Sequence, residues 1–493
     1  MHFISTRGNK EKVTGSQAII NGLCNDGGLY VPTFFPNISN KLSKLINLSY
    51  QDLCFEILKL FLDDFTEEEL KLCINNAYDK KFDTLKIAPT KKVNDTFFLE
   101  LYHGPTCAFK DMALTLMPYL LQTSLKKNNI KDEVVILTAT SGDTGKAALE
   151  GFKNIDQIKI IVFFPEDGVS TIQKLQMQSQ EGNNTYVVSI NGNFDDAQTA
   201  VKTIFNDEEF EKLLTDNHYI LSSANSINIG RLLPQVVYYF YSYFDLVKNK
   251  YIQLGDKVNF SVPTGNFGNI LACYYAKLMG LPVNKLICAS NDNNVLYDFF
   301  SSGTYNKNRE LILTSSPSMD ILVSSNLERL LFEISSRNDK KVSSLINDLN
   351  NKGIYEIDEN MKHNLSCFAG EYVNELKVKK NINKVFKEFN YLIDTHTCVA
   401  YSAYEKYLDE TNDYTPTVIV STASPYKFSK DVLYSLGEEV NNLNEFDIIN
   451  NLSSFSHTKV PSPIEKLKEA KILHKTNCEK YQIKDEIKNI LKV

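Results

Sequence analysis

The pattern of apolar and polar positions changes near residue 92. Before it, the sequence favours helices, with the clearest segments at Gln51–Leu62 and Glu67–Tyr78. From about Thr96, short β-branched or aromatic runs are each followed by a turn and a helical stretch. This alternation is typical of strands in a parallel sheet that are joined by helices. We therefore predict a helical N-terminal domain over residues 1–92 and an α/β core from residue 93.

The core contains two series of strand–helix units. The first predicts Val134–Leu137 with a helix from Thr144, Ile158–Phe164 with Ser170–Gln180, and Thr185–Ile190 with Asp195–Phe205. The second predicts strands at Tyr219–Leu221, Val258–Val262 and Leu286–Cys288, with helices from Ile229 and Asn269. We expect a doubly wound core over 93–430, with a smaller βα domain at roughly 130–215. After Asn306 the order weakens until a last strand, Thr417–Val420, and residues 431–493 are predicted to be helical.

Composition narrows the class of protein and its partners. The 493 residues are 43% hydrophobic and 23% charged, which is typical of a soluble globular protein. The net charge is -7 and the basic residues are dispersed, so we expect no nucleic-acid partner. No signal peptide or membrane span is indicated, and the nine cysteines form no CxxC pair. We expect a cytoplasmic protein without a metal site, and the oligomeric state stays open between monomer and homodimer.

We expect candidate binding residues in the turns after strands, because ligands of such sheets bind at the carboxyl ends of strands. One strand, Phe97–Leu101, is followed by Gly104-Pro105 and a helix that begins near Lys110. The helix dipole and burial would lower the pKa of this amine, and a neutral amine is what a Schiff base requires. A surface lysine on an amphipathic helix is the alternative, and on this segment alone it is favoured.

A hydroxyl-rich turn follows the next strand. Its residues Thr140, Ser141, Asp143 and Thr144 could present backbone amides and hydroxyls to a phosphate or carboxylate. The turn is not a P-loop, because its glycines are too close and Ala147 replaces the Ser or Thr that holds magnesium. An ordinary N-capped helix is the alternative.

Two further turns complete the set. Residues 265–269 form a glycine turn after a strand, where the backbone can approach a phosphate closely. The spacing is not GxGxxG, so a dinucleotide is not favoured. The last strand ends in Ser421 and Thr422, whose hydroxyls could serve a ring nitrogen; local backbone bonding is the alternative.

In this order the motifs resemble the pyridoxal-phosphate enzymes of fold type II, and specifically the threonine synthases of the longer bacterial and fungal type. The segments Phe3–Gly8 and Asp26–Pro32 are similar to the N-terminal signature of that family. Three positions depart from its usual pattern. The family usually has His at Ser424, often Asp at Asn269, and Pro-His-Thr-Ala at Thr395–Cys398.

The resemblance implies a role for each motif. Lys110 would bind pyridoxal 5'-phosphate as a Schiff base. The phosphate of this cofactor would lie in the glycine turn, formed by Gly265, Asn266, Phe267, Gly268 and Asn269, with Thr422, or failing it Ser421, beside the pyridine nitrogen. The substrate would contact Thr140, Ser141, Asp143, Thr144, Ser226 and Arg231. Arg231 suits a phosphate because a guanidinium binds it through two parallel hydrogen bonds; without the resemblance it would be interpreted as a helix-surface arginine.

The resemblance also implies a reaction. The substrate of the family is O-phospho-L-homoserine, which is converted with water to L-threonine and phosphate by γ-elimination and β-hydration. A threonine-synthase-like phospho-lyase that releases a 2-keto acid, ammonia and phosphate is the alternative enzyme. A binding or regulatory protein on an inactive enzyme fold is the alternative from another class, and the presence of Lys110, both glycine-containing turns and Arg231 argues against it.

Overall fold

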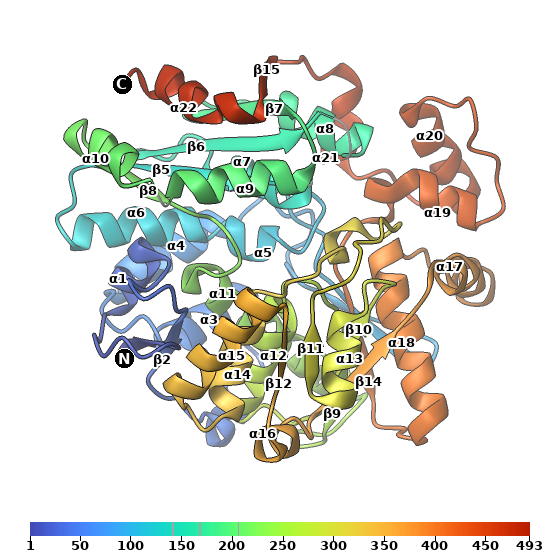
Figure 1. Cartoon of the computed structure of the whole chain (residues 1–493). Helices are drawn as coiled ribbons and strands as arrows, with labels where there is room; N and C mark the ends of the chain where they lie inside the picture. Colours follow the sequence, from blue (N-terminus) through green and yellow to red (C-terminus); the bar gives the residue numbers. More distant parts are fainter. Residues whose placement is uncertain (141, 167–168, 206) are drawn as a thin grey trace.

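The computed structural model describes residues 1–140, 142–166, 169–205 and 207–493. Within these residues, two α/β layers are stacked, each built on a mainly or wholly parallel sheet (Figure 1). Two short antiparallel pairs complete the strands.

The upper sheet in Figure 1 has the strand order β15-β7-β6-β5-β8, and all of its pairings are parallel. Its middle strands are almost wholly apolar and buried, as expected when helices cover both faces. The predicted placement of the first three strands in one sheet is confirmed, whereas β8 pairs with β5 and not with the later strands of its series. The elements of this layer are β5 (Glu133–Ala139), α7 (Asp143–Phe152), β6 (Ile158–Pro165), α8 (Thr171–Gln178), β7 (Thr185–Asn191), α9 (Phe194–Phe205), α10 (Glu208–Asp216), β8 (Tyr219–Ser222), β15 (Thr476–Glu479) and α22 (Ile483–Leu491).

The C-terminal region does not contain helices alone, which corrects the sequence prediction. Strand β15 lies parallel to β7 at the edge of the upper sheet, and the C-terminal segment returns to this layer from α19 and α20 (Figure 1). The strand is short, and its sequence TNCE is polar apart from one buried cysteine, so it carries no alternating apolar pattern. Its conformation depends on pairing with β7, a long-range contact that local sequence does not encode.

The lower sheet has the order β13-β10-β9-β14-β4-β3, and only the β3–β4 pair is antiparallel. The prediction missed β13, whose sequence FAGEY includes a glycine and a glutamate and lies in the region where the order weakens. The elements of this layer are β3 (Thr90–Val93), β4 (Thr96–Glu100), α11 (Ile229–Lys248), β9 (Val258–Pro263), α12 (Gly268–Leu278), β10 (Val283–Ser290), α13 (Val295–Ser302), β13 (Phe368–Tyr372), α18 (Thr395–Thr411) and β14 (Thr417–Ser421). Helices α5 (Asp111–Leu114) and α6 (Met117–Lys127) lie between the two layers and contact both α7 and α11.

The N-terminal helices pack against the lower layer. Helix α3 lies on α11, and α1 and α4 lie on α6. Buried residues such as Phe3, Leu53 and Ile74 belong to the same hydrophobic core as the helices of the lower layer. The domain boundaries at residues 92 and 430 stay predictions. The N-terminal elements are β1 (Phe3–Ser5), α1 (Gly15–Asn21), β2 (Tyr30–Pro32), α2 (Leu42–Leu45), α3 (Tyr50–Leu58) and α4 (Glu67–Ala77).

The remaining elements flank the lower layer or connect the two layers. They are β11 (Thr304–Asn306), the 3₁₀ turn η2 (Pro317–Met319), α14 (Leu327–Ile334), α15 (Asp339–Lys352), β12 (Ile354–Glu356), α16 (Glu359–Asn364), α17 (Glu375–Phe389), the 3₁₀ turn η3 (Pro425–Phe428), α19 (Ser429–Ser435), α20 (Glu445–Ser456) and α21 (Ser462–Glu465). Over the described ranges, no helix is long and apolar enough to cross a membrane.

Candidate active site

The loop after β4 presents Lys110, which is the N-cap residue of the short helix α5. The carboxylate of Asp111 folds back and accepts hydrogen bonds from the backbone N–H of Thr106 at 2.8 Å and from its hydroxyl at 2.6 Å. Burial raises the pKa of Asp111 to about 6, although the bonds from Thr106 oppose this shift. Gly104 makes the fold-back possible, because a Cβ there would lie 2.5 Å from the carboxylate of Asp111.

The same loop is tied to the end of β14. The backbone N–H of Phe109 donates to the carbonyl of Thr422 at 2.8 Å, and that of Ser424 donates to the carbonyl of Cys107 at 3.0 Å. Thr422 is buried. Its carbonyl bond to Phe109 places it directly beside the lysine loop. Ser424, at the position where His is usual, caps η3 by accepting a hydrogen bond from the backbone of Tyr426.

The amine of Lys110 is almost completely buried. Its Nζ donates to Ser318 Oγ at 3.2 Å and lies 3.7 Å from Asp143 Oδ2, and the side chain is 11% exposed. Burial lowers the pKa of Lys110 to about 8, with Lys427 and Arg231 acting in the same direction and Asp143 opposing them. A substantial fraction of this amine is therefore neutral under mildly alkaline conditions, which is the property that Schiff-base formation requires.

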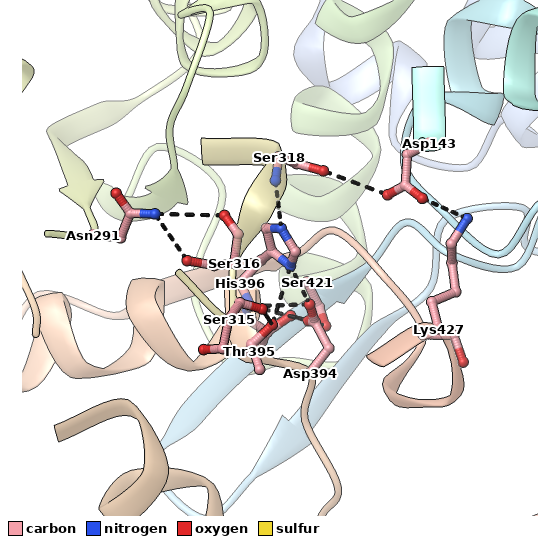
Figure 2. A network of polar contacts seen from close by, with 12 residues as sticks. Asp143, Asn291, Ser315, Ser316, Ser318, Asp394, Thr395, His396, Ser421 and Lys427 are labelled. Carbon is pink, nitrogen blue, oxygen red and sulfur yellow. Dashed lines mark hydrogen bonds and ion pairs between the residues drawn. The ribbon is translucent and has the colours of Figure 1, made fainter. Parts of the chain in front are cut away.

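Asp143 occupies the first turn of α7 and contacts two lysines. Its Oδ1 forms an ion pair with Lys427 Nζ at 2.7 Å (Figure 2). The same oxygen accepts a hydrogen bond from Gln173 Nε2 at 2.9 Å, while Oδ2 lies 3.7 Å from Lys110 Nζ. Burial by itself would raise the pKa of the Asp143 carboxyl, but the two ammonium groups hold it well below its usual range. Lys427 and Gln173 were not predicted as site residues, because no local pattern distinguishes either of them from a surface residue.

The other residues of the predicted substrate loop differ in their contacts. The hydroxyl of Thr140 accepts the backbone N–H groups of Gly142 at 3.0 Å and Gly145 at 2.9 Å, so it closes the loop. Thr144 is half-buried in the first turn of α7. Ser141 lies outside the described residues.

The glycine turn, residues 265–269, joins β9 to α12. Phe267 is the N-cap residue with a left-handed φ of 64°, and within the described chain no side chain caps the helix. The first N–H groups of α12 are therefore available to an anion. A Cβ on Gly265 would lie 2.8 Å from the carbonyl oxygen of Ser318, so the turn packs directly against the residue that contacts Lys110.

Asn269, the last residue of the glycine turn, is held by two tyrosine hydroxyls. Its Oδ1 accepts hydrogen bonds from the hydroxyls of Tyr238 and Tyr239, each at 2.6 Å. Its Nδ2 is buried and has no hydrogen-bond partner among the described residues. The side chain fixes the start of α12 through the two tyrosines, and the unpaired amide hydrogens are a cost of having Asn here.

Ser226 lies close to the glycine turn, and Arg231 lies near enough to Lys110 to lower its pKa. Arg231 is buried at the start of α11, where one guanidinium nitrogen donates to the carbonyl of Ala224 at 2.7 Å. Its Nε is buried and unpaired in the part of the chain that the structure describes. Burial lowers the pKa of Arg231 to about 10, so it stays cationic at neutral pH. Ser226 accepts a hydrogen bond from Asn326 at 3.2 Å, and its Cβ lies 3.8 Å from the place that a Cβ on Gly268 would take.

A buried carboxylate, Asp394, supports two sides of the site at the start of α18. Its Oδ2 lies 2.8 Å from His396 Nδ1, and His396 Nε2 accepts the backbone N–H of Ser318 at 3.2 Å (Figure 2). Its Oδ1 accepts the hydroxyl of Thr397, which lies 2.9 Å from Ser421 Oγ. One carboxylate thus orders both Ser318, beside Lys110, and Ser421, at the end of β14. The sequence alone identifies Thr395–Cys398 only as a departure from a family pattern.

These groups fit pyridoxal phosphate. They provide a buried amine of lowered pKa, an uncapped helix start with an adjacent glycine, and hydroxyls at the end of β14. The geometry brings together Lys110, Asp143, the glycine turn, Ser226, Arg231 and Thr422, and their individual roles stay predictions. No cluster of three or more His, Cys, Asp or Glu side chains that could hold a metal occurs in the described ranges.

Comparison with known proteins identifies the family. Residues 2–78 match the family described as threonine synthase N terminus, and residues 87–423 match the family described as pyridoxal-phosphate dependent enzyme. Threonine synthase-like 1 of Homo sapiens is 40% identical over 464 residues, covering 90% of this chain and 61% of its own length. Threonine synthase of Saccharomyces cerevisiae is 35% identical over 481 residues, covering 91% of both chains.

A solved structure agrees with these relatives. The PLP-bound threonine synthase from Brucella melitensis superposes with a TM-score of 0.88 at 34% identity and covers 100% of both chains. The predicted fold class and cofactor are confirmed by this match and by the family models. The chain spans 61% of the length of the human relative, so the activity of the whole protein stays a matter for proposal. The chain belongs to the threonine synthase family of pyridoxal-phosphate-dependent carbon–oxygen lyases, with the fold of type II.

Proposed function

We propose that this protein is a threonine synthase, which converts O-phospho-L-homoserine and water to L-threonine and phosphate. The observation that carries the proposal is the position of a buried amine of lowered pKa, Lys110, near two groups suited to phosphates. One is the uncapped start of α12 in the glycine turn, and the other is the unpaired guanidinium N–H of Arg231. A cofactor phosphate and a substrate phosphate would each have a binding group.

The residues of the glycine turn would hold the cofactor phosphate, and Arg231 with Ser226 and Thr144 would hold the substrate phosphate. A phosphate would give the Nε of Arg231 a charge-assisted partner. Thr422, or Ser421, would face the pyridine nitrogen with a hydroxyl. A hydroxyl leaves this nitrogen less positively charged than a carboxylate would, which disfavours transamination.

When it is bound, pyridoxal phosphate supplies an electron sink for the negative charge that develops at the substrate Cα. The amine of Lys110 would take a proton from Cα and exchange protons with Cβ, and its pKa of about 8 suits both directions of transfer. Arg231 would stabilise the phosphate as it leaves Cγ. The burial of Lys110 and Asp143 keeps bulk water from this region until a water molecule adds at Cβ.

The test is incubation of the purified chain with O-phospho-L-homoserine while phosphate and L-threonine are measured together. Equal amounts of both are expected. Release of phosphate with 2-oxobutyrate and ammonia, and without threonine, would overturn the proposal in favour of the phospho-lyase. The similarity to proteins named threonine synthase-like 1 makes this product analysis essential.

Arg231→Met should raise the KM for O-phospho-L-homoserine, because the guanidinium is proposed to bind the phosphate of this substrate.

A further inference from the structure

Lys427 is a fully buried lysine whose ammonium contacts the lysine loop and Asp143. Its side chain is 0% exposed, and its Nζ contacts Asp143 Oδ1 at 2.7 Å, the carbonyl of Thr106 at 2.9 Å and Gln176 Oε1 at 3.4 Å. The three donors of the ammonium thus have three acceptors. Burying an ammonium group takes it out of water, which costs considerable solvation free energy. The three oxygen partners of Lys427 offset this cost.

The contacts of Lys427 connect the two layers. Lys427 lies in η3, directly after β14 of the lower sheet, whereas Asp143 and Gln176 lie on α7 and α8 of the upper layer. Thr106 belongs to the loop that presents Lys110. The single ammonium therefore joins the lysine loop to Asp143, the carboxylate that faces Lys110 from the other layer. Figure 2 shows its pair with Asp143.

Asp143 lies between two ammonium groups at unequal distances. Lys427 is 2.7 Å from one carboxylate oxygen, and Lys110 is 3.7 Å from the other. We propose that Lys427 is a positioning residue, which occupies Asp143 as its closer counter-ion and so keeps the amine of Lys110 available in its neutral, nucleophilic form. This inference rests on the proposed role of Lys110 in binding the cofactor.

The groups around Lys110 give the direction of the effect. Asp143 on α7 favours the protonated amine, whereas Lys427 on η3 and Arg231 on α11 disfavour it, and Ser318 on η2 is a neutral hydrogen-bond partner. Loss of Lys427 would remove one of the two opposing cations and leave Lys110 as the nearest cationic partner of Asp143. The amine would then be protonated up to a higher pH.

The test follows covalent attachment of pyridoxal phosphate to the full-length protein after the cofactor has been stripped. The attachment rate is read from the change in visible absorbance over a pH series, and the midpoint pH of the rate is compared between variants. In Lys427→Met we expect the midpoint to rise by about one pH unit, which is about a tenfold slower attachment below the midpoint. In Lys427→Met/Asp143→Asn, the midpoint should return to the wild-type value or fall below it.

Lys146 offers a matched control. It is also a mostly buried lysine near the start of α7, but it pairs with Glu150 and Gln180, away from Lys110. Lys146→Met should lose stability without moving the midpoint. A midpoint in Lys427→Met that is unchanged, or equal to that of Lys146→Met, would overturn the proposal. A midpoint pH that rises equally in Lys427→Met and in Lys427→Met/Asp143→Asn would also overturn the proposal. Such a result would show that the shift does not depend on the charge of Asp143.

The result is separable from the proposed function. Attachment of the cofactor does not depend on whether the product is threonine or a keto acid. If Lys110→Ala still attached the cofactor covalently, the role of Lys110 would be wrong and the inference about Lys427 would fall with it. Circular dichroism of every variant shows whether the fold is intact before the rates are compared.

Discussion

The two ends of the site are held in different ways. The lysine end, formed by Lys110, Asp143, Lys427 and Ser318, depends on buried charges that meet across the two layers. The glycine turn, residues 265–269, contains no charged side chain and depends on a left-handed residue, a close backbone contact and neutral hydrogen bonds.

This difference shows how each end should respond to change. A charge-held end is sensitive to pH and to the loss of one charged group, because the remaining buried charges are left unbalanced. A backbone-held end is sensitive to added volume, because the atoms in contact belong to the main chain and cannot rotate away. Substitutions at the two ends test this contrast.

Lys110→Ala should abolish the chemistry of the lysine end. We expect the rate of product formation to fall by about 10³-fold or more, since the amine is proposed both to bind the cofactor and to transfer protons. The measurement is phosphate release from O-phospho-L-homoserine together with the visible spectrum. The exposed Lys340 provides the control, and Lys340→Ala should retain both signals. An active Lys110→Ala protein would show that the reactive amine is elsewhere.

Gly265→Ala should damage the glycine turn through volume alone. The added Cβ would lie 2.8 Å from the carbonyl of Ser318, so the turn or η2 must move. A displacement of this order near a reacting group can cost about 10²-fold in rate. Gly268→Ala is the matched comparison, because a Cβ there would lie 3.5 Å from Asn326, and we expect a clearly smaller loss. Equal losses in kcat/KM for the two variants would contradict this account of the turn.

The sequence predicted the glycine turn and the lysine loop well, because both signals are local. Glycines after an apolar strand and a lysine at a helix start can be identified within about ten residues. The same holds for the buried strands of both sheets, whose apolar runs differ from their surroundings. The turns after strands were predicted as the places for ligands, and the structure brings the lysine loop, the glycine turn and the end of β14 together with Asp143 from the other layer.

The supporting residues could not be predicted in the same way. Lys427 resembles any surface lysine in the sequence, and only the packing of η3 against α7 and α8 reveals its burial. Asp394 and His396 act through Ser318, which is distant in sequence and lies on the short 3₁₀ turn η2. Strand β15 likewise depends on a partner almost 300 residues away. These features arise from long-range packing, which local patterns do not encode.

The pH dependence of the free energy of unfolding should differ between the lysine loop and the glycine turn, and this effect should be smaller than the two above. Burial opposes protonation of His103, but hydrogen bonds with Asp83 and Glu100 raise the pKa of His103 to about 9 from an ordinary 6.5. Because the folded state binds this proton more tightly, its contribution is complete below pH 6.5 and is lost as the pH rises through about 9. Asp83 is largely exposed and screened, so we expect on the order of 1 kcal/mol.

The measurement is the free energy of unfolding in urea across this pH range, for the wild type and for His103→Asn. The difference between the two proteins should shrink as the pH rises. A constant difference would mean that the imidazole contributes through packing and not through its charge. Gly265→Ala should show the pH dependence of the wild type, since the glycine turn contains no group that titrates in this range.

Asn269→Asp should have the smallest effect, because it tests the neutrality of the glycine turn without adding volume. A carboxylate offers two oxygens to the hydroxyls of Tyr238 and Tyr239. It also removes the buried Nδ2, whose lack of a partner among the described residues destabilises the folded protein by about 1–3 kcal/mol. The new charge must be desolvated near a phosphate, but the start of α12 favours a negative group. These effects oppose each other, so we expect kcat/KM to change by less than about threefold.

Asn269→Leu, which leaves both tyrosine hydroxyls without this acceptor, should lower the free energy of unfolding by about 1–3 kcal/mol. A loss above about tenfold in Asn269→Asp would show that the turn must be neutral to hold a phosphate, and that it is as sensitive to charge as the lysine end.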